Sequence, residues 1–101
     1  MRADSQVVDT SRHADVVREL IAEVLGVPRE SVHPASALMK DLGAESIDFL
    51  DLVFRIEDVI GRRIPIGRWE RFIEERLPDG DHGHTITTEI VCEFADRETC
   101  R

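Results

Sequence analysis

The chain has 101 residues, and its content of 42% hydrophobic and 34% charged residues is that of one globular domain. Its 21 acidic residues outnumber the 13 basic ones and give a formal net charge of −8, which disfavours nucleic-acid binding and suits partners with a basic docking surface. No apolar run reaches the roughly 20 residues of a membrane span, and the N-terminus has no apolar signal core. We therefore expect a cytoplasmic protein without stable membrane insertion.

The first predicted helix follows a polar N-terminal stretch. Asp9, Thr10 and Ser11 offer N-caps for this helix, and Gly26 with Pro28 ends it. Between these limits, apolar residues recur at steps of three and four, as on one face of an amphipathic helix: Val16, Val17, Leu20, Ile21, Val24 and Leu25. A helix of this kind buries one face against the rest of the domain.

Residues 26–45 form a long connection to the second helix. Structureless loops of roughly 20 residues are uncommon in compact domains. Residues 36–40 are able to supply one helical turn, and Leu38 and Leu42 are placed to pin the loop to the core. We therefore expect a packed connection rather than a free one.

The second helix is predicted to run from Ser46 to Ile60, with Gly61 closing it. A short extended segment, Ile64-Pro65-Ile66, then leads to a third helix, which Pro78 and Gly80 stop. The apolar residues on one face of this third helix are Trp69, Phe72, Ile73 and Leu77.

The last helix is predicted to begin with Thr85 as its cap. Its inward residues would be Ile86, Ile90, Val91 and Phe94. No stretch alternates over the length of a strand, so the fold class is all-α, a bundle of three main helices and a further one of variable length. We expect a flexible N-terminal tail at 1–10, one domain at 11–97 and a C-terminal tail at 98–101.

The polar loop before the last helix contains three possible metal ligands, Asp81, His82 and His84. They do not make a closed set of four ligands, so we expect no metal site. Cys92 and Cys100 lack both CxxC and zinc-site spacing, and in the cytosol both are expected to be reduced thiols.

The second helix carries more apolar surface than one buried face requires. One set of apolar residues clusters on one side of it: Phe49, Leu52, Val53, Ile56 and Ile60. A neighbouring stripe of Ile47, Leu50 and Phe54 has acidic residues on both flanks. In one interpretation this is a central helix, with Leu50 and Phe54 in the core. In the other, which the acidic flanks favour, the second stripe contacts partners, because an apolar centre with a charged rim is a common interface plan.

The segment of residues 41–48, Asp-Leu-Gly-Ala-Glu-Ser-Ile-Asp, is the most informative part of the chain. Gly43 permits a sharp bend, and Ser46 follows at the mouth of the second helix. A serine there is commonly an N-cap, although Phe49 stands where the Glu or Gln of a capping box would be. A helix N-terminus also stabilises a phosphate, so Ser46 is suited to carry a phosphodiester. No catalytic base is evident nearby, because all four histidines lie outside this segment.

This segment resembles the Asp-Leu-Gly-Ala-Asp-Ser-Leu-Asp signature of the acyl carrier protein family. The resemblance continues without gaps through the second helix to Gly61 and Ile64-Pro65, and the first helix and the long first loop also fit. Thr85-Ile86 is similar to the start of the family's last helix. The resemblance implies a four-helix bundle of the acyl-carrier type, with three main helices, a variable third helix and a long first loop.

The resemblance also implies that Ser46 is esterified with 4′-phosphopantetheine from coenzyme A. The chain would then be a non-catalytic, monomeric phosphoprotein that carries acyl thioesters between enzymes of fatty-acid, lipid or related biosynthesis. Its partners would be a phosphopantetheinyl transferase and acyl-loading and acyl-transfer enzymes. The implied recognition surface combines acidic residues with apolar contacts, namely Asp41, Glu45, Asp48, Asp51, Glu57 and Asp58 with Ile47, Leu50 and Phe54.

The chain departs from the family pattern in several places. Glu45 and Ile47 replace the commoner Asp and Leu, and Arg55 interrupts the acidic face. The stretch between Pro65 and Thr85 is longer than usual and is rich in arginine. It is expected either to form a longer third helix with a buried apolar face and solvated arginines, or to enclose an unusual acyl chain or dock a dedicated enzyme.

Two other functions remain open from the sequence. An aminoacyl or peptidyl carrier would share the arm and the fold, although the acidic second helix favours a stand-alone acyl carrier. An acidic helical interaction module without a prosthetic group would use Ser46 only as a helix cap. The enzyme that loads the arm-bearing form separates the two kinds of carrier. Replacing Ser46 with Ala separates a carrier from a binding module, because a carrier would lose all activity and a binding module would lose little.

Overall fold

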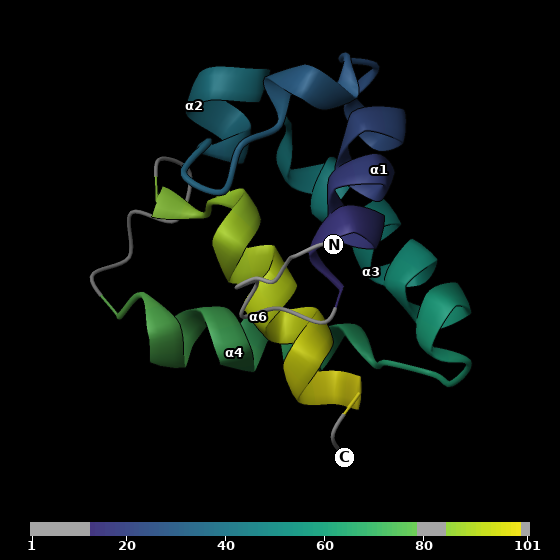
Figure 1. Ribbon diagram of the computed structural model, residues 1–101. Helices are drawn as coiled ribbons and strands as arrows, with labels where there is room; N and C mark the ends of the chain where they lie inside the picture. The colour runs from purple at the N-terminus through teal and green to yellow at the C-terminus, as the bar shows by residue number, and fades with distance from the viewer. Residues whose placement is uncertain (1–12, 79–84, 100–101) are drawn as a thin grey trace, which may run out of the picture.

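The computed structural model describes residues 13–78 and 85–99 of the chain (Figure 1). These residues form α-helices and one short 3-10 helix, and within them the all-α class predicted from the sequence is confirmed. The elements follow in the order α1 (Ala14–Leu25), η1 (Arg29–Ser31), α2 (Leu38–Leu42), α3 (Ser46–Ile60), α4 (Ile66–Arg76) and α6 (Thr88–Thr99).

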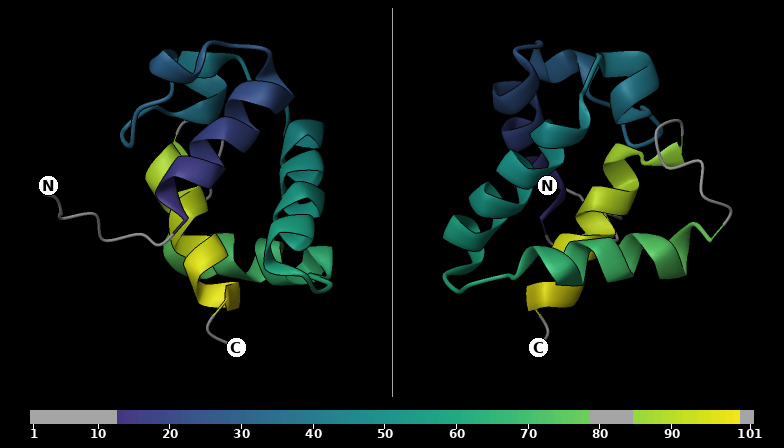
Figure 2. Two further views of the ribbon diagram at one scale, coloured as in Figure 1. Left: turned by 45° about the vertical axis from the view of Figure 1, so that its right-hand side comes forward. Right: turned by 180° about the vertical axis from the view of Figure 1, so that it is seen from behind.

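Helix α1 packs against both α3 and α6, and α3 also contacts α4 and α6. The buried residues of α1, Val17 and Ile21, belong to the apolar stripe that the sequence pattern predicted. Helix α2 and the start of α3 lie at one end of the bundle, and α4 crosses the other end (Figures 1 and 2). Ser46, the first residue of α3, therefore lies at the end of the molecule away from α4.

An aromatic cluster joins α4 to the other helices. Phe49 of α3 stacks on Trp69 of α4 at 5.8 Å between ring centroids, and Phe94 of α6 meets Trp69 edge-on at 5.1 Å. Phe72 lies 5.3 Å from Phe94, and Ile73 is buried beside them in the core. Aromatic pairs at these distances contribute packing energy beyond burial alone. The expected buried apolar face of the third helix is confirmed, and this face is part of the main core.

The connection between α1 and α3 is packed, as the sequence predicted. It contains η1 and α2, and Leu38 is fully buried. The Leu38 backbone N–H donates to the Ile86 carbonyl at 2.9 Å, and the Thr88 N–H donates to the Ser36 carbonyl at 3.1 Å. These two bonds hold α2 beside the start of α6, and so they anchor the segment that leads into Ser46.

The start of α1 lies at Ala14, with His13 in the N-cap position. His13 Nδ1 lies 2.9 Å from a carboxylate oxygen of Asp96, which joins the start of α1 to α6. The tail expected at 1–10 and the caps expected at Asp9, Thr10 and Ser11 lie outside the described residues.

The start of α6 differs from the prediction. The helix begins at Thr88, and the Thr87 side-chain oxygen accepts a hydrogen bond from the Ile90 N–H at 3.3 Å. Thr87, rather than Thr85, is therefore the threonine that supports the first turn. The backbone between Thr85 and the helix is held instead by the bonds to the loop around Ser36 and Leu38.

The end of α6 also extends further than expected. The helix continues to Thr99, past the domain end placed at residue 97. Glu98 is only 4% exposed, and its carboxylate accepts a hydrogen bond from Arg68 Nε of α4 at 2.9 Å. The last turn of α6 is therefore packed against α4 and is part of the bundle.

Within the described ranges, no helix is long and apolar enough to cross a membrane. Among the same residues, no three His, Cys, Asp or Glu side chains gather as a metal site would require. The loop with Asp81, His82 and His84 lies outside these ranges, as does Cys100, whereas Cys92 is buried in α6.

Candidate functional site

The turn before α3 is fixed by backbone bonds to a single carbonyl group. Helix α2 ends at Gly43, which has a left-handed φ of 78° that favours glycine. The N–H groups of Gly43 and Ala44 both donate to the Leu38 carbonyl, the second at 2.9 Å. Ala44 is buried, so the turn is held on the core and delivers the chain into α3 in one direction.

Ser46 is the first residue of α3, and Glu45 occupies the N-cap position. The helix start predicted at Ser46 is therefore confirmed, whereas the alternative role of Ser46 as the N-cap is not what the structure shows. The Asp48 carboxylate accepts a hydrogen bond from the Glu45 backbone N–H at 2.8 Å, in the manner of a capping box. Because Glu45 and Asp48 form the cap, the Ser46 hydroxyl does not have to do so, and Ser46 is exposed.

The position of Ser46 suits a phosphodiester. The positive end of the α3 dipole stabilises an anion at the first turn, and the free amides of a helix N-terminus are a common seat for phosphate. An exposed hydroxyl on this turn is also accessible to an enzyme that attaches a group to it. The exposed position of Ser46 at the helix N-terminus therefore fits a serine-linked phosphate ester.

The apolar stripe predicted beside Ser46 lies on the surface. Ile47 is 66% exposed, Leu50 43% and Phe54 63%. The neighbouring stripe of Phe49, Leu52, Val53 and Ile56 is buried. The interpretation that placed Leu50 and Phe54 in the core is therefore wrong, and α3 presents one apolar face to the core and another to solvent.

Three of the acidic residues predicted for recognition also hold the backbone. The Asp41 carboxylate accepts a hydrogen bond from the Ala37 N–H at 2.9 Å and so supports the start of α2. A Glu57 carboxylate oxygen accepts one from the Ile64 N–H at 2.7 Å and so fixes the connection from α3 to α4. Asp48 is the third, through its bond to the Glu45 N–H.

The other acidic residues predicted for recognition are exposed: Glu45, Asp51 and Asp58. Asp51 is paired with Arg55 at 3.2 Å, and a second nitrogen of Arg55 lies 3.0 Å from Glu23 of α1. Arg55 therefore neutralises two carboxylates and links α3 to α1. The sequence showed Arg55 as an interruption of the acidic face, but gave no sign of its partner on α1.

Comparison with known proteins gives a family for this arrangement. Residues 15–68, more than half of the chain, match the family described as "Phosphopantetheine attachment site". The matched range includes α1 except its first residue, and all of α2 and α3 with Ser46. An acyl carrier protein of Saccharopolyspora erythraea is 30% identical over 79 residues, which are 78% of each chain. The chain belongs to the acyl carrier protein family.

Two further relatives have a higher sequence identity to this chain than the Saccharopolyspora erythraea protein has, but over a shorter range. Proteins named acyl carrier protein AcpXL, from Rhizobium meliloti and Brucella melitensis, are 41% and 39% identical to it over 61 residues. Those residues are 60% of this chain and 64% and 66% of the two relatives, so the chain spans just under two thirds of their length.

Family membership supplies the cofactor predicted from the sequence, a covalently attached 4′-phosphopantetheine. The exposed serine at the first turn of α3 is a chemically suitable acceptor within the matched range. The feature that sequence reasoning missed is the cap that Glu45 and Asp48 form around this serine. The sequence contained a signal for this cap, because Glu45 and Asp48 are three positions apart, as the two residues of a capping box are.

Proposed function

We propose that this chain is an acyl carrier whose 4′-phosphopantetheine arm is attached at Ser46. The observation that carries the proposal is the position of Ser46, exposed at the first turn of α3 within the range that matches the attachment-site family. The exposed apolar stripe that follows it on α3 supports the same role, because an attached arm and its enzymes need a contact surface beside the serine.

In this proposal a transferase brings the Ser46 hydroxyl to the pyrophosphate of coenzyme A. The serine oxygen forms a bond to the phosphorus of the phosphopantetheinyl group, the pyrophosphate P–O bond breaks, and 3′,5′-ADP leaves while the hydroxyl proton is released. The bound arm supplies a terminal thiol on which acyl groups are carried as thioesters. The bend at Gly43 and the bond between Asp48 and the Glu45 N–H position the serine, and the N-terminus of α3 stabilises the phosphodiester. The chain itself catalyses no reaction, and the tether raises the local concentration of the acyl group at each partner enzyme.

The partner surface is the stripe of Ile47, Leu50 and Phe54 with its acidic surroundings. Enzymes with basic patches, the transferase first among them, would approach this surface under electrostatic attraction. Such contacts weaken as salt is added, and a shuttle requires this weakness because it must leave each enzyme. We place this cycle in the cytoplasm, with the carrier acting as a monomer.

The proposed cargo is an acyl group of fatty-acid, lipid or related biosynthesis. This part of the proposal rests on the relatives, which are named acyl carrier proteins. An aminoacyl or peptidyl cargo would need a different loading enzyme. Incubating the arm-bearing protein with an acyl-loading enzyme and, separately, with an aminoacyl-activating enzyme distinguishes these cargoes by the mass that is added.

Attachment is tested by intact mass spectrometry after incubation with coenzyme A, magnesium and a broad-specificity phosphopantetheinyl transferase. We expect one phosphopantetheinyl increment on the parent protein and none on Ser46→Ala. Ser31→Ala is the matched control, because Ser31 is also exposed and lies on η1, and it should accept one increment. Absence of the increment from the parent, both in this assay and in protein purified from its native host, would favour an interaction module without a prosthetic group.

A further inference from the structure

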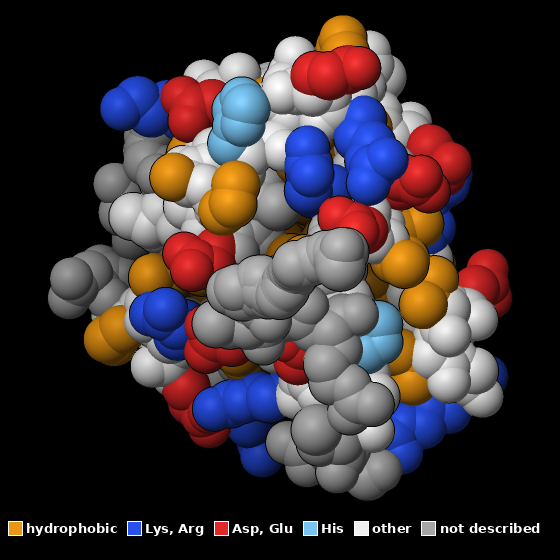
Figure 3. Space-filling model, viewed as in Figure 1, with side chains coloured by type: hydrophobic (Ala, Val, Ile, Leu, Met, Phe, Trp, Pro, Cys, Tyr) orange, Lys and Arg blue, Asp and Glu red, His pale blue; other side chains and the backbone are white. Residues whose placement is uncertain are grey.

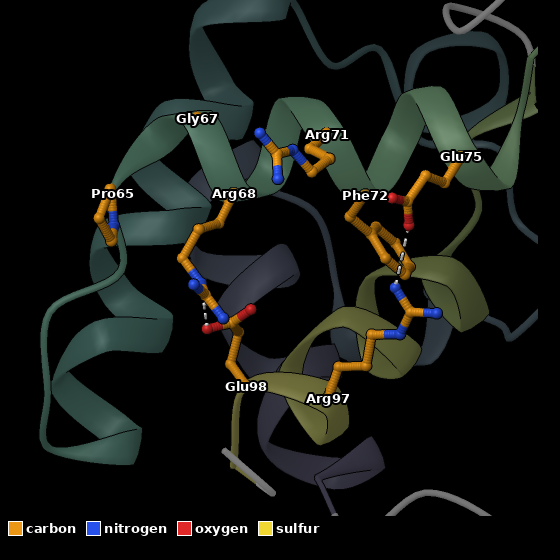
Figure 4. A pocket seen from close by; sticks show the side chains of 8 residues that line it. All are labelled: Pro65, Gly67, Arg68, Arg71, Phe72, Glu75, Arg97 and Glu98. Carbon is orange, nitrogen blue, oxygen red and sulfur yellow. Dashed lines mark hydrogen bonds and ion pairs between the residues drawn. The ribbon is translucent and has the colours of Figure 1, made fainter.

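A hollow lies between α4 and the last turns of α6, at the end of the bundle away from Ser46 (Figure 4). Its volume is about 520 Å³, which is within the range of small-molecule sites in proteins. Unlike most such sites, it is lined mainly by charged side chains. The lining residues are Pro65, Gly67, Arg68, Arg71, Phe72, Glu75, Arg97 and Glu98.

Two ion pairs of unequal strength cross this hollow from α4 to α6. Arg68 Nε lies 2.9 Å from the buried carboxylate of Glu98. Arg97 lies 3.6 Å from Glu75, and both of these side chains are at least half exposed. The Arg97 guanidinium also lies over the Phe72 ring, 5.2 Å from its centroid. An exposed pair at such a distance is weak, so Arg97 is available to a stronger anion.

Arg71 lies on α4 between these two ion pairs (Figure 4). It is exposed, and it makes no ion pair or hydrogen bond with any other residue in the described ranges. It is one helical turn from both Arg68 and Glu75, at spacings of three and four residues. Arg71 therefore places a positive charge at the edge of the hollow, and no ion pair within the described ranges neutralises this charge.

The positive charge continues into an adjoining hollow of about 350 Å³, which Arg62 and Arg63 line together with Arg68. The two hollows are lined by five arginines and only two glutamates, although the whole chain carries a charge of −8. In the space-filling view, basic side chains gather along the lower edge, where α4 and the end of α6 lie (Figure 3). The lining of these two hollows is thus opposite in charge to the chain as a whole.

We propose that the hollow between α4 and α6 binds a phosphate group, held by Arg71 and Arg97. A guanidinium presents two parallel N–H donors that match the oxygens of a phosphate, and such charge-assisted bonds are stronger than neutral ones. Binding exchanges the loose Arg97–Glu75 pair for this contact and leaves the tight Arg68–Glu98 pair intact. The phosphodiester proposed at Ser46 does not supply this phosphate, because Ser46 lies at the other end of α3.

The phosphate has two possible sources, a soluble phosphate ester or the headgroup of a phospholipid. The two sources present the same oxyanion to the arginines. A headgroup would also place α4 against an anionic surface and leave the Ser46 end directed away from it (Figure 1). The test therefore has one arm for each source.

For the first arm, the full-length chain is titrated with inorganic phosphate at constant ionic strength, and backbone amides are followed by NMR. We expect saturable shifts confined to α4 and the last turns of α6, with a Kd of about 1 mM or tighter. Arg71→Gln should weaken this binding about 10-fold. The variant keeps its fold, because Arg71 is exposed and has no ion pair to lose. Arg29→Gln, which removes an exposed arginine at the α2 end, is the charge-matched control and should change the Kd less than about 2-fold.

For the second arm, the same proteins are sedimented with phosphatidylcholine vesicles that contain or lack phosphatidylglycerol. If the parent protein is retained on the phosphatidylglycerol vesicles, and Arg71→Gln abolishes this retention while Arg29→Gln preserves it, the phosphate is that of a lipid headgroup. Saturable phosphate binding without vesicle retention assigns it to a soluble ester. The proposal is overturned if neither probe binds, or if the two arginine variants lose binding equally, because the charge of the chain rather than the hollow would then be responsible.

Discussion

The carboxylate of Asp48 and the backbone N–H of Glu45 are joined by a hydrogen bond of 2.8 Å, and Ser46 lies between these two residues in the chain. The first turn of α3 is thereby closed by the neighbours of the serine rather than by the serine itself. This arrangement holds Ser46 in one place and keeps its hydroxyl accessible. The stability of the turn and the chemistry of Ser46 are therefore assigned to different side chains.

Replacing Asp48 with Ala should lower the free energy of unfolding by about 0.5–2 kcal/mol, the usual loss for a removed helix cap. It should also slow phosphopantetheinyl transfer, because Ser46 is held less firmly. Urea unfolding followed by circular dichroism measures the first effect. Asp58→Ala is the control, since Asp58 is exposed on the same helix, and its effect should stay within about 0.5 kcal/mol. Equal losses in the two variants would show that the bond to Glu45 does not stabilise the turn.

Two phenylalanines of α3 should respond in opposite ways to truncation. Phe54 is 63% exposed, so Phe54→Ala should change the free energy of unfolding by less than about 0.5 kcal/mol while raising the KM of the transferase. Phe49 is 6% exposed and stacks on Trp69, so Phe49→Ala should cost about 3–5 kcal/mol. An unchanged KM for Phe54→Ala would mean that the exposed stripe does not contact this enzyme.

Arg55 should reduce the attraction between the carrier and a basic partner, because it neutralises both Asp51 and Glu23. Arg55→Ala should therefore raise kcat/KM for the transferase at low salt and steepen its fall as salt is added. The loss of two exposed ion pairs should cost only about 0–1 kcal/mol each. Arg29→Ala makes the same change of charge away from α3 and should have a smaller effect. A lower kcat/KM for Arg55→Ala would instead indicate that Arg55 contacts the partner directly.

Glu98 should contribute to stability although it lies close to the end of the chain. Its buried carboxylate is paired with Arg68, and removal of such a hydrogen-bonded partner costs about 1–3 kcal/mol. Glu98→Ala should lower the midpoint of urea unfolding accordingly. Glu70→Ala, which removes an exposed carboxylate of α4, should leave the midpoint nearly unchanged. A Glu98→Ala protein as stable as the parent would show that the last turn of α6 does not stabilise the bundle.

The sequence was sufficient to locate the helices that carry the core, because apolar periodicity is a local property. It also identified Ser46 and the separate apolar stripe of α3. It predicted the start of the second helix at Ser46 correctly, but it offered Ser46 rather than Glu45 as the possible cap, since serine is the better cap by intrinsic preference. In the structure, the bonds from Gly43 and Ala44 to the Leu38 carbonyl precede the helix start at Ser46, with Glu45 as its cap.

Long-range pairs account for most of what the sequence did not predict. Glu98 looked like part of a charged tail because its partner, Arg68, lies 30 positions earlier in the chain. Glu57 looked like a recognition residue because its bond to the Ile64 N–H forms only when the connection after α3 folds back. The longer third helix was correctly expected to bury its apolar face. Deleting α4 to test its function would also remove Trp69 from the core.

The most direct test of the account is to locate the prosthetic group by tandem mass spectrometry of trypsin-digested holo protein. Trypsin cleaves after Lys40 and Arg55, and Ser46 is the only hydroxyl-bearing residue in the peptide of residues 41–55. We predict that this peptide carries one phosphopantetheinyl group and that fragment ions on both sides assign the group to Ser46. A phosphopantetheinyl group found on any other peptide, with residues 41–55 unmodified, would contradict the central claim.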